Sequence, residues 1–424
     1  MRLTLVNKYY PPHVGGIEFH VRDLAEALAA AGHQVRVIVC NNEQLYTEEV
    51  AGGVEIVRLP RRAELASTPI AHNFGRVLAY EARSADLLHF HFPYPWSEAQ
   101  WVLQQASKTT PYVVTYHSDI VRQKLALRFY QPFLNRFLDR ARLIIASSPQ
   151  LIASSPYLGA RADKCRQVNF GLPTDLIAHD QGAIARAAEL REQFAGAPIV
   201  LFVGRLVYYK GIEVLAHAAG QVAGAQFVVI GKGPERATLE GIVTAAGARD
   251  RLHIIDYADD AELRAWYHAA DLLTLPSTSP SEAFGLVQIE AHAAGTPVVS
   301  SDLPTGVTYA NLDGITGLTT KTGDPAALAA ALNRLLADDP LRKKLGAQAQ
   351  SRALTDFSIK AMLKATTHVY HEALGADEGE AARSSGDTPQ PLSSTAPSAT
   401  TARGEDSPED RAASPSDARK EQAS

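Results

Sequence analysis

The sequence is poor in cysteine and has no long apolar run. Among its 424 residues only Cys40 and Cys165 are cysteines, which excludes a disulfide framework and a cysteine cluster for zinc or iron–sulfur. No uncharged apolar stretch approaches the roughly 18 residues that a membrane-spanning helix needs. Residues 1–6 are too short for the apolar core of a signal peptide. We therefore expect a cytoplasmic protein that does not span a membrane.

Two common phosphate-binding motifs are also absent. No strand is followed by the Gly-x-Gly-x-x-Gly fingerprint of a dinucleotide site, which argues against an NAD-linked oxidoreductase. The chain also lacks Gly-x4-Gly-Lys-Ser/Thr, which argues against a P-loop NTPase. We expect no nucleic-acid partner.

Charge is distributed unevenly along the chain. The 41 basic and 46 acidic side chains give a formal net charge of −5. Residues 376–424 hold 10 acidic and 5 basic side chains, so they account for the whole excess and residues 1–375 are balanced. This last segment has no aromatic residue, Val or Ile, and cannot bury enough apolar surface to offset its ordering entropy. The composition predicts a disordered tail over residues 376–424.

The rest of the chain alternates short apolar runs with helix-length amphipathic stretches, which predicts an α/β fold with parallel sheets. The first series of strands is expected at 3–6, 35–39, 87–90, 112–116 and 143–146, with a helix over 18–31. The second series is expected at 199–203, 227–230, 252–255, 272–275 and 297–300. Because a loose stretch around residues 171–198 separates the series, we predict two doubly wound domains.

Ligands of open parallel sheets bind beyond the carboxyl ends of the strands. After the first strand, Gly15 and Gly16 precede a helix and would let a ligand approach backbone N–H groups. After the strand at 199–203, Arg205 and Lys210 lie five residues apart, where the pair could hold a diphosphate. The alternative for Gly15 and Gly16 is a tight turn without a ligand. The alternative for Arg205 and Lys210 is a solvated basic loop.

The segment Ser281–Ala291 carries two carboxylates, Glu282 and Glu290, around an expected helix start. Eight residues of helix rise about 12 Å, whereas carboxylates that flank one hydrolysed glycosidic bond are about 5–9.5 Å apart. The pair therefore suits opposite ends of one long ligand, with the amides of Phe284, Gly285 and Leu286 facing phosphates between them. The alternative is two surface glutamates.

His117 follows the strand at 112–116, where it could hydrogen-bond a substrate hydroxyl or stabilise developing charge. A single histidine among 14 is more often structural. His89 and His91 also end a strand, and we assign them packing or polar support.

Residues 119–142 combine six basic and two acidic side chains with many aliphatic and aromatic ones. Such a stretch fits an interfacial element that faces anionic lipid. An equally good interpretation is a pair of core helices with a solvated basic face, broken near Pro132. The first interpretation would place the protein peripherally on the inner face of the plasma membrane.

Together these segments resemble family 4 of the nucleotide-sugar glycosyltransferases, which have the two-domain GT-B fold. The resemblance covers residues 1–375 and rests on these motifs in this order: Gly15-Gly16-Ile17-Glu18, Gly204-Arg205-Leu206 with Lys210-Gly211, and Glu282-x7-Glu290 followed by Gly295-Thr296-Pro297-Val298-Val299. It implies two Rossmann-like domains facing a cleft. Residues 1–175 would form the acceptor side, completed by a final helix at about 357–375, and residues 176–356 the nucleotide-sugar side.

The resemblance also implies retaining transfer of a sugar from a nucleoside diphosphate, with residue roles carried over by position. Arg205 and Lys210 would hold the diphosphate, helped by Gly15–Gly16 and the amides of 284–286. Glu282 would bind the sugar hydroxyls, Glu290 the ribose, and His117 would lie beside the reacting carbon. Members of the family need no dedicated metal ion, in agreement with the absence of an Asp-x-Asp motif from residues 1–375.

Residues 117–124 further resemble bacterial mannosyl- and rhamnosyltransferases of envelope polysaccharide assembly. The resemblance narrows the expectation to a hexosyltransferase that acts on a lipid-linked or glycan acceptor, with GDP-mannose the leading donor and a UDP-hexose second. Asn169-Phe170-Gly171 stands where Pro-Asn-Gly is usual, and His292 stands where Met is common. A sugar-nucleotide epimerase and a catalytically silent binding subunit remain the competing hypotheses.

Overall fold

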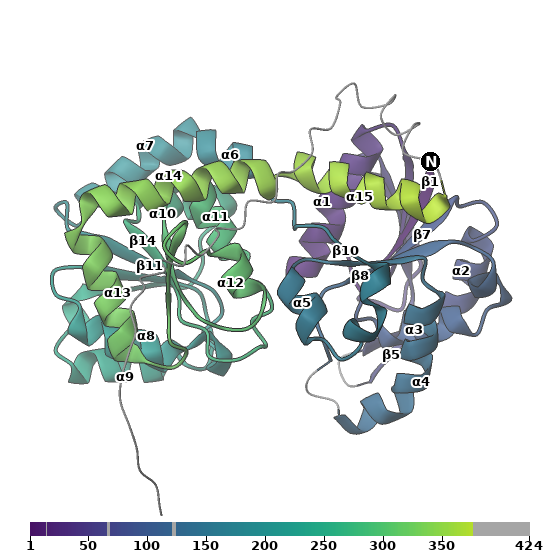
Figure 1. The fold of residues 1–424 in the computed structure, drawn as a ribbon, viewed down its shortest axis with the longest axis horizontal. Helices are drawn as coiled ribbons and strands as arrows, with labels where there is room; N and C mark the ends of the chain where they lie inside the picture. Colours follow the sequence, from purple (N-terminus) through teal and green to yellow (C-terminus); the bar gives the residue numbers. More distant parts are fainter. Residues whose placement is uncertain (14, 66–67, 121–123, 376–424) are drawn as a thin grey trace, which may run out of the picture. The chain divides into compact units, whose positions relative to one another are not determined.

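Two parallel β-sheets contain most of the strands in this computed structural model (Figure 1). The structure describes residues 1–13, 15–65, 68–120 and 124–375, and within these the side chains of residues 124–127 are not described. The predicted disordered tail, residues 376–424, lies outside the described residues. Both sheets belong to one compact unit.

The strands are β1 (Arg2–Val6), β2 (Gln34–Cys40), β3 (Thr47–Ala51), β4 (Val54–Leu59), β5 (Arg61–Leu65), β6 (Thr68–Ala71), β7 (Leu87–Phe92), β8 (Tyr112–Tyr116), β9 (Leu143–Ala146), β10 (Cys165–Gln167), β11 (Ile199–Val203), β12 (Gln226–Ile230), β13 (Leu252–Ile255), β14 (Leu272–Leu275), β15 (Val298–Ser301) and β16 (Gly317–Thr320). All ten strands expected from the sequence are present, with ends that differ by at most two residues.

The α-helices are α1 (Gly16–Ala30), α2 (Phe74–Glu81), α3 (Pro95–Val102), α4 (Lys124–Arg140), α5 (Pro149–Ser154), α6 (Thr174–His179), α7 (Gln181–Glu192), α8 (Ile212–Gln221), α9 (Arg236–Ala245), α10 (Asp260–Ala269), α11 (Val287–Ala293), α12 (Gly306–Ala310), α13 (Pro325–Ala337), α14 (Asp339–Asp356) and α15 (Ile359–Leu374). Short 3-10 turns lie at Gln105–Lys108, Gly159–Lys164, Tyr208–Lys210 and Arg249–Arg251.

The first sheet has the order β10-β9-β8-β7-β1-β2-β4-β3. Its strands pair in parallel except for β3, which runs antiparallel to β4. The chain builds outward from β1 in one direction and then returns to place β7 on the other side of β1. This reversal creates a switch point between β1 and β7, where the loops beyond the strands diverge and leave room for a ligand.

The second sheet has the order β13-β12-β11-β14-β15-β16 and is wholly parallel. The same reversal occurs here between β11 and β14. Neighbouring strands at this switch point are far apart in the sequence, so the segments that follow them meet only through the fold. The remaining strands, β5 and β6, form a separate antiparallel hairpin.

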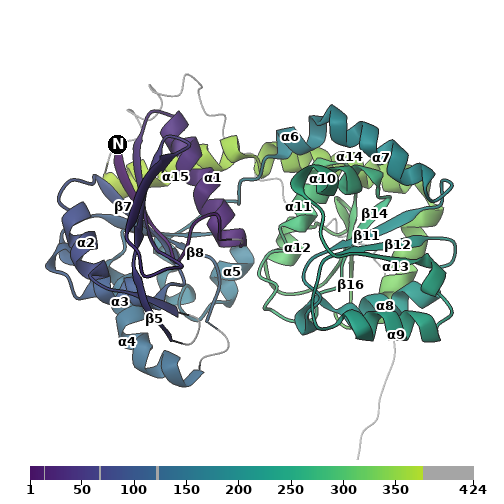
Figure 2. The same cartoon turned by 180° about the vertical axis from the view of Figure 1, so that it is seen from behind.

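Each sheet is covered by helices on both faces (Figures 1 and 2). In the first sheet, alternate residues of each strand enter a core with α1 and α15 or a core with α2, α3 and α4. The second sheet divides its side chains in the same way between α8, α9 and α13 on one face and α7, α10 and α11 on the other. The two-sided burial explains why the central strands are almost continuously apolar.

The chain passes between the two sheets at two adjacent points. Leu172 forms a parallel bridge with Ser358, in which the Leu172 N–H donates to the Phe357 carbonyl at 2.8 Å and the Ile359 N–H donates to the Leu172 carbonyl at 3.2 Å. After this bridge α15 places Met362, Val369 and Tyr370 in the core of the first sheet. The last helix therefore completes the core that the first strands began.

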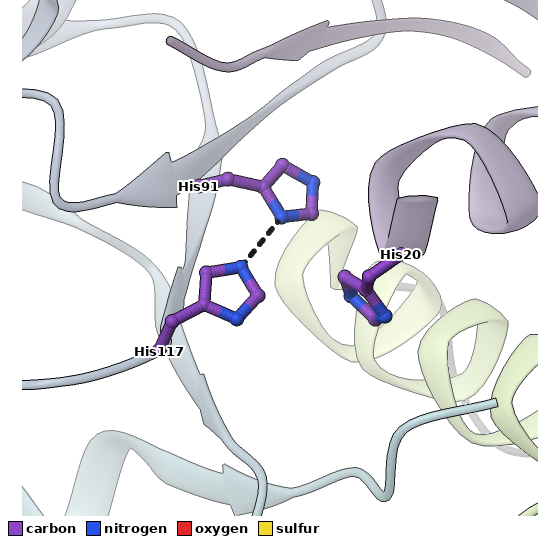
Figure 3. Close-up of side chains that lie close together, drawn as sticks. All are labelled: His20, His91 and His117. Carbon is purple, nitrogen blue, oxygen red and sulfur yellow. Dashed lines mark hydrogen bonds between the residues drawn. The ribbon is translucent and has the colours of Figure 1, made fainter. Parts of the chain in front are cut away.

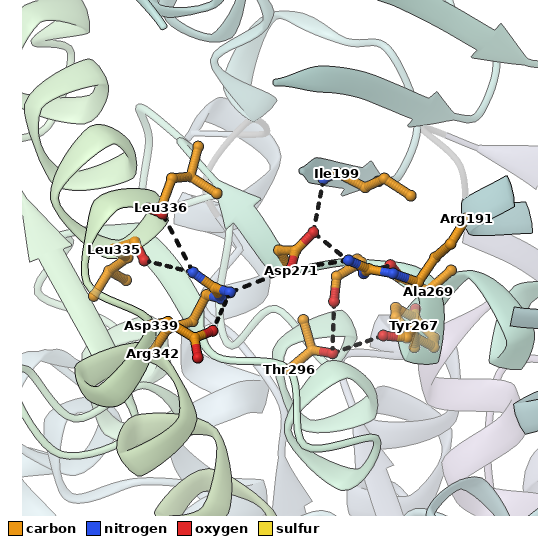
Figure 4. A network of polar contacts seen from close by, with 11 residues as sticks. Arg191, Ile199, Tyr267, Ala269, Asp271, Thr296, Leu335, Leu336, Asp339 and Arg342 are labelled. Atoms are coloured by element: carbon orange, nitrogen blue, oxygen red, sulfur yellow. Dashed lines mark hydrogen bonds and ion pairs between the residues drawn. The ribbon is translucent and has the colours of Figure 1, made fainter. Parts of the chain in front are cut away.

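A polar network fixes the start of β14 to the surrounding helices (Figure 4). The Asp271 carboxylate accepts hydrogen bonds from the Ile199 N–H at 2.9 Å and from Arg191 at 3.2 Å. Arg342 lies 3.6 Å from the same carboxylate and also pairs with Asp339 at 2.6 Å. This network ties β11, β14, α7 and α14 together where the two strands begin, at the opposite end of the sheet from the switch-point loops.

The basic stretch at 119–142 differs in part from expectation. One continuous helix, α4, runs through Pro132, so the predicted break at this proline is wrong. Leu134, Phe137 and Leu138 are buried in the core of the first sheet, whereas the Phe129 side chain is 78% exposed. The C-terminal half of α4 is thus a core helix. Within the described ranges, no helix combines the length and apolarity needed to cross a membrane.

Candidate functional site

Glycines on both sides of Lys210 shape the loop that follows β11. Gly211 has a φ of 70°, and a Cβ atom there would lie 1.9 Å from the Pro276 carbonyl oxygen. A side chain is therefore excluded on both conformational and steric grounds. Gly204 has a φ of 150°, and a Cβ atom there would lie 3.4 Å from Cε of Lys210. Gly211 thus lets the loop approach the Pro276 backbone, and Gly204 leaves room for the Lys210 side chain.

Lys210 and Glu282 form a buried ion pair at this switch point. Nζ of Lys210 lies 2.5 Å from Oε2 of Glu282, and the Ser277 hydroxyl donates to the same oxygen at 3.0 Å. Lys210 is 9% exposed and Glu282 is 7% exposed. Lys210 follows β11 and Glu282 follows β14, so the neighbouring positions of these strands bring together two charges that are distant in the sequence.

Arg205, the second predicted phosphate contact, has a different environment. It is exposed, at the end of β11 beyond Gly204, and its guanidinium lies 3.5 Å from the Tyr209 hydroxyl. Arg205 therefore offers its planar donors toward solvent, while Lys210 offers a point charge from a buried position. Donors of these two kinds suit an anion that is partly enclosed by the protein.

The residues between the two glutamates lead into α11, which begins at Val287, with Leu286 as its N-cap. Phe284 is buried, and its carbonyl accepts a hydrogen bond from the Gln288 side chain at 2.9 Å. Gly285 has a φ of 72°. The turn at Gly285 therefore separates Glu282, in the loop, from Glu290, within the helix.

Glu290 has partners of its own. The Tyr267 hydroxyl donates to the Glu290 carboxylate at 2.5 Å. Burial raises the pKa of Glu290, and the hydrogen bond from Tyr267 opposes this effect. The two glutamates thus lie in separate environments, one paired with a lysine and the other with a tyrosine, in keeping with contacts to different parts of one ligand.

The glycine loop after β1 approaches the same segment. Helix α1 begins at Gly16, with Gly15 as its N-cap, and a Cβ atom on Gly16 would lie 3.7 Å from the Leu286 side chain. Gly16, Leu286 and Glu290 line a cavity of about 500 Å³ together with His20 and residues that include Tyr267. Arg205, Lys210 and Glu282 are not part of this cavity lining.

His117 lies beyond β8 in a cluster of buried histidines (Figure 3). Its Nε2 lies 3.1 Å from Nδ1 of His91, and its ring centroid lies 5.3 Å from that of His20. Burial lowers the pKa of His20 to about 4 and lowers the pKa values of His91 and His117, so all three imidazoles are neutral at physiological pH. Neutral imidazole both accepts and donates a hydrogen bond.

Aromatic rings connect this cluster with the segment that carries the glutamates. The Phe170 ring stacks on His117 with a centroid separation of 5.8 Å, and it meets the Phe284 ring edge-on at 5.0 Å. Phe170 lies in the segment where the sequence departs from the usual Pro-Asn-Gly. Its ring links His117 to Phe284, two of the predicted site residues.

The structure thus groups the predicted residues into three pairs or clusters: Lys210 with Glu282, Gly16 with Leu286 and Glu290, and His117 with two other histidines. His89 has the expected supporting role, because its two ring nitrogens bond to Tyr370 at 2.6 Å and Thr115 at 2.7 Å. His91, which we also assigned to support, contacts His117 through its Nδ1.

Sequence reasoning missed Ser277, Tyr267 and His20 as members of these groups. The position of Ser277 two residues after a buried strand is a usable signal. His20 lies one helical turn after Gly16, on the helix that follows the glycine loop, which is a weaker signal. Tyr267 carries none, because its contact with Glu290 depends on how α10 packs on α11.

Two doubly wound parallel sheets, each with polar groups gathered beyond its switch point, define a GT-B glycosyltransferase fold. A solved structure of sucrose-phosphate synthase from Thermosynechococcus elongatus is similar to this chain, with a TM-score of 0.72 and 28% sequence identity over 89% of this chain and 100% of that one. The similarity therefore extends over both sheets.

Family models match both halves of the chain. Residues 14–176 match Glycosyltransferase Family 4, and residues 188–352 match Glycosyl transferases group 1. The chain is 32% identical over 350 residues to D-rhamnosyltransferase WbpZ of Pseudomonas aeruginosa, which covers 82% of this chain and 90% of the relative. It is 29% identical over 371 residues to O-antigen chain mannosyltransferase C of Escherichia coli, covering 87% and 98% respectively. The chain belongs to glycosyltransferase family 4.

Proposed function

We propose that this glycosyltransferase is a retaining hexosyltransferase that moves mannose from GDP-mannose to a lipid-linked or polysaccharide acceptor in cell-envelope glycan synthesis. The observation that carries the proposal is the buried Lys210–Glu282 pair at the switch point between β11 and β14. A cation for phosphate and a carboxylate for hydroxyls lie side by side, which matches the order of groups in a sugar diphosphate. The names of the mannosyl- and rhamnosyltransferase relatives support the hexose and the acceptor class.

In this proposal Lys210 and Arg205 hold the diphosphate, aided by the Gly15–Gly16 loop and the backbone amides of residues 284–286. Glu282 accepts hydrogen bonds from sugar hydroxyls. Glu290 accepts them from the ribose, for which the neighbouring cavity of about 500 Å³ offers space. His117 lies beside the reacting carbon and orients the sugar through its neutral imidazole.

The chemical step breaks the bond between the sugar C1 and the diphosphate oxygen. The acceptor oxygen forms the new bond on the same face, and its proton passes to the departing diphosphate. Lys210 and Arg205 stabilise the negative charge that grows on the diphosphate, the general role of preorganised cations in group transfer. The transfer needs no dedicated metal in this scheme, because two cationic side chains supply the charge.

The acceptor side is proposed to include the first sheet and the exposed face of α4. Arg128, Phe129 and Arg136 are exposed on α4, which supports peripheral attachment to the anionic cytoplasmic face of the membrane. A lipid-linked acceptor would be presented at such a surface.

A thermal-shift panel of nucleotide sugars with purified full-length protein tests the donor. GDP-mannose is expected to raise the melting temperature, because a ligand that binds only the native state stabilises it. UDP-glucose and UDP-galactose serve as alternative donors. A larger shift with a UDP-sugar than with GDP-mannose would indicate that the donor is a UDP-sugar. No shift with any nucleotide sugar would overturn the proposal.

Site variants tie the shift to the proposed contacts. Arg205→Ala is expected to reduce the GDP-mannose shift, whereas Lys321→Ala, which removes an exposed lysine directly after β16, is expected to preserve it. Incubation of the protein with donor alone separates the competing epimerase function. Conversion of GDP-mannose into an isomeric GDP-sugar without acceptor would contradict the transferase proposal, whereas slow release of GDP and free mannose would support it.

A further inference from the structure

Three histidines from separate parts of the first domain meet in the interior (Figure 3). His20 lies on α1, His91 near the end of β7, and His117 just beyond β8. One ligand atom of each residue lies within 4.8 Å of those of the other two. Because β1 and β7 flank the switch point, the cluster lies where this sheet would accommodate a ligand.

The cluster leaves several ring nitrogens without a partner. His91 Nδ1 and His117 Nε2 face each other at 3.1 Å and share one hydrogen bond. Among the described residues, no hydrogen-bond partner meets His20 Nδ1, His91 Nε2 or His117 Nδ1, although all three atoms are buried. A buried polar atom without a hydrogen-bond partner destabilises the fold. Each of the three imidazoles therefore keeps one ring nitrogen that the described residues do not use.

The neighbouring His89 shows that burial alone does not produce this arrangement. Its ring lies 4.4 Å from that of His91 between centroids, yet both of its nitrogens bond to side chains of the protein. His89 thus has a complete set of partners within the protein. His20, His91 and His117, which are 8%, 2% and 5% exposed, lack such a set.

We propose that His20, His91 and His117 form a binding site for a divalent transition-metal ion of the Zn²⁺ type. Imidazole nitrogens prefer Zn²⁺, Co²⁺, Ni²⁺ and Cu²⁺ over Mg²⁺ and Ca²⁺. Three histidines plus one open position is a known arrangement for Zn²⁺, with Zn–N distances of about 2.0–2.1 Å. These distances place tetrahedral nitrogens about 3.4 Å apart, so closure from 4.8 Å needs only small side-chain movements.

His20 connects the cluster with a neighbouring cavity. This residue lines the cavity of about 500 Å³ that also contains Gly16 and Glu290. One member of the cluster thus borders a cavity, whereas His91 and His117 are not among the residues that line it.

The proposal that the three histidines bind a metal ion does not depend on the proposed function. The expected effect of that metal on sugar transfer does rest on it. If His117 orients the donor sugar, a metal ion on the same ring withdraws it from that role. We therefore expect Zn²⁺ to inhibit transfer rather than to assist it, and a chelator to reverse the inhibition.

The test uses full-length protein freed of metal with a chelator and dialysed. Equilibrium dialysis against ZnCl₂, with metal analysis, is expected to give one tightly bound ion per chain, and Mg²⁺ is expected to give none. His20→Gln and His91→Gln are each expected to weaken Zn²⁺ binding at least tenfold. The matched controls are His292→Gln, a buried histidine outside the cluster with an unpartnered Nε2, and the exposed His72→Gln, which are both expected to bind normally.

A measurement on the unmodified chain keeps the proposal testable if a variant fails to fold. X-ray absorption spectroscopy of the Zn²⁺-loaded protein is expected to show three imidazole nitrogens at about 2.0–2.1 Å. Fewer than three imidazoles at the metal, unchanged binding by folded His20→Gln and His91→Gln, or no stoichiometric binding would overturn the metal site. Tight binding without inhibition would leave the site in place and contradict the role of His117 in donor binding.

Discussion

The side chains of Lys210 and Glu282 lie 2.5 Å apart and are both buried, although they follow different strands of the second sheet. A buried ion pair is strongly destabilising to break from one side, by about 3–5 kcal/mol, because an uncompensated charge is left behind. The same two groups are proposed to hold the donor. A variant of either residue can therefore change both stability and turnover, and the two effects have to be measured separately.

The first prediction concerns this pair. Lys210→Met and Glu282→Gln are each expected to lower the free energy of unfolding, Lys210→Met by about 3–5 kcal/mol. The double variant is expected to recover part of that loss without recovering turnover. Urea titration and a donor-consumption assay measure the two effects. Recovery of turnover in the double variant would show that the pair has only a structural role.

The second prediction concerns Glu290, whose pKa is raised by burial. Because its charge is unfavourable in the folded protein, Glu290→Gln is expected to leave stability at pH 8 unchanged or higher. The same change is expected to weaken GDP binding about tenfold or more, through loss of a carboxylate contact with the ribose. The exposed Glu189→Gln is the control. Equal GDP affinity in wild type and Glu290→Gln, measured by calorimetry, would remove Glu290 from the donor site.

The third prediction is a pH dependence that originates in the first domain. Glu98 is buried, accepts a hydrogen bond from the Tyr94 N–H at 2.7 Å, and also accepts one from the Tyr130 hydroxyl. Burial raises the pKa of Glu98 from 4.5 to about 8. The folded state therefore keeps a proton that the unfolded chain releases, and the stability from this group falls as pH rises from about 4.5 to about 8.

Between pH 4.5 and pH 8, the free energy of unfolding is expected to fall by at most about 1.4 kcal/mol per pH unit, because one proton is involved. Glu98→Gln is expected to remove this slope and to be more stable than wild type at pH 8, with a smaller difference at pH 5. Urea titrations at pH 5, 6, 7 and 8 measure the difference. Parallel pH curves for the two proteins would contradict the assignment.

The fourth prediction compares two carboxylates that both pair with Arg342. The Asp271 side chain is 10% exposed and also accepts the Ile199 N–H, whereas the Asp339 side chain is 50% exposed. Asp271→Ala is expected to destabilise by about 3 kcal/mol because it leaves buried groups unpaired, and Asp339→Ala by less than about 1 kcal/mol. Similar melting temperatures for the two variants would show that the network contributes little.

The fifth prediction concerns the exposed residues of α4. Wild-type protein is expected to co-sediment with vesicles that contain anionic lipid and not with neutral vesicles. Arg128→Glu/Arg136→Glu is expected to lose this binding, while Arg249→Glu/Lys343→Glu, in the 3-10 turn before β13 and in α14, is expected to keep it. If wild-type sedimentation does not depend on anionic lipid, α4 is a core helix with a solvated face.

The sequence predicted the parts of the fold that are governed by burial. Strands such as β8, β9 and β11 are short apolar runs, and their bounds agree with the expected ones. The polar strands β3 and β5 have no such signal, since most of their residues are exposed. The bounds of the two domains, 1–175 and 176–356, stay a prediction.

The sequence indicated which residues lie near the candidate site, but not which of them contact each other. The rule that ligands bind beyond strand ends selected Lys210, Glu282 and His117. It could not show that Lys210 meets Glu282, because that contact depends on β14 lying beside β11. The histidine cluster likewise depends on β7 lying beside β1. The roles of these residues in transfer stay predictions until the variants are measured.

The bridge between Leu172 and Ser358 has a consequence for synthesis of the protein on the ribosome. The first sheet needs Met362, Val369 and Tyr370 of α15 to fill its core, and these residues are made after the whole second sheet. At about 5–20 residues per second, the roughly 200 intervening residues delay them by on the order of 10–40 s. The N-terminal domain, although translated first, is therefore the last to complete its core, and a nascent chain must protect its unfinished apolar face throughout that interval.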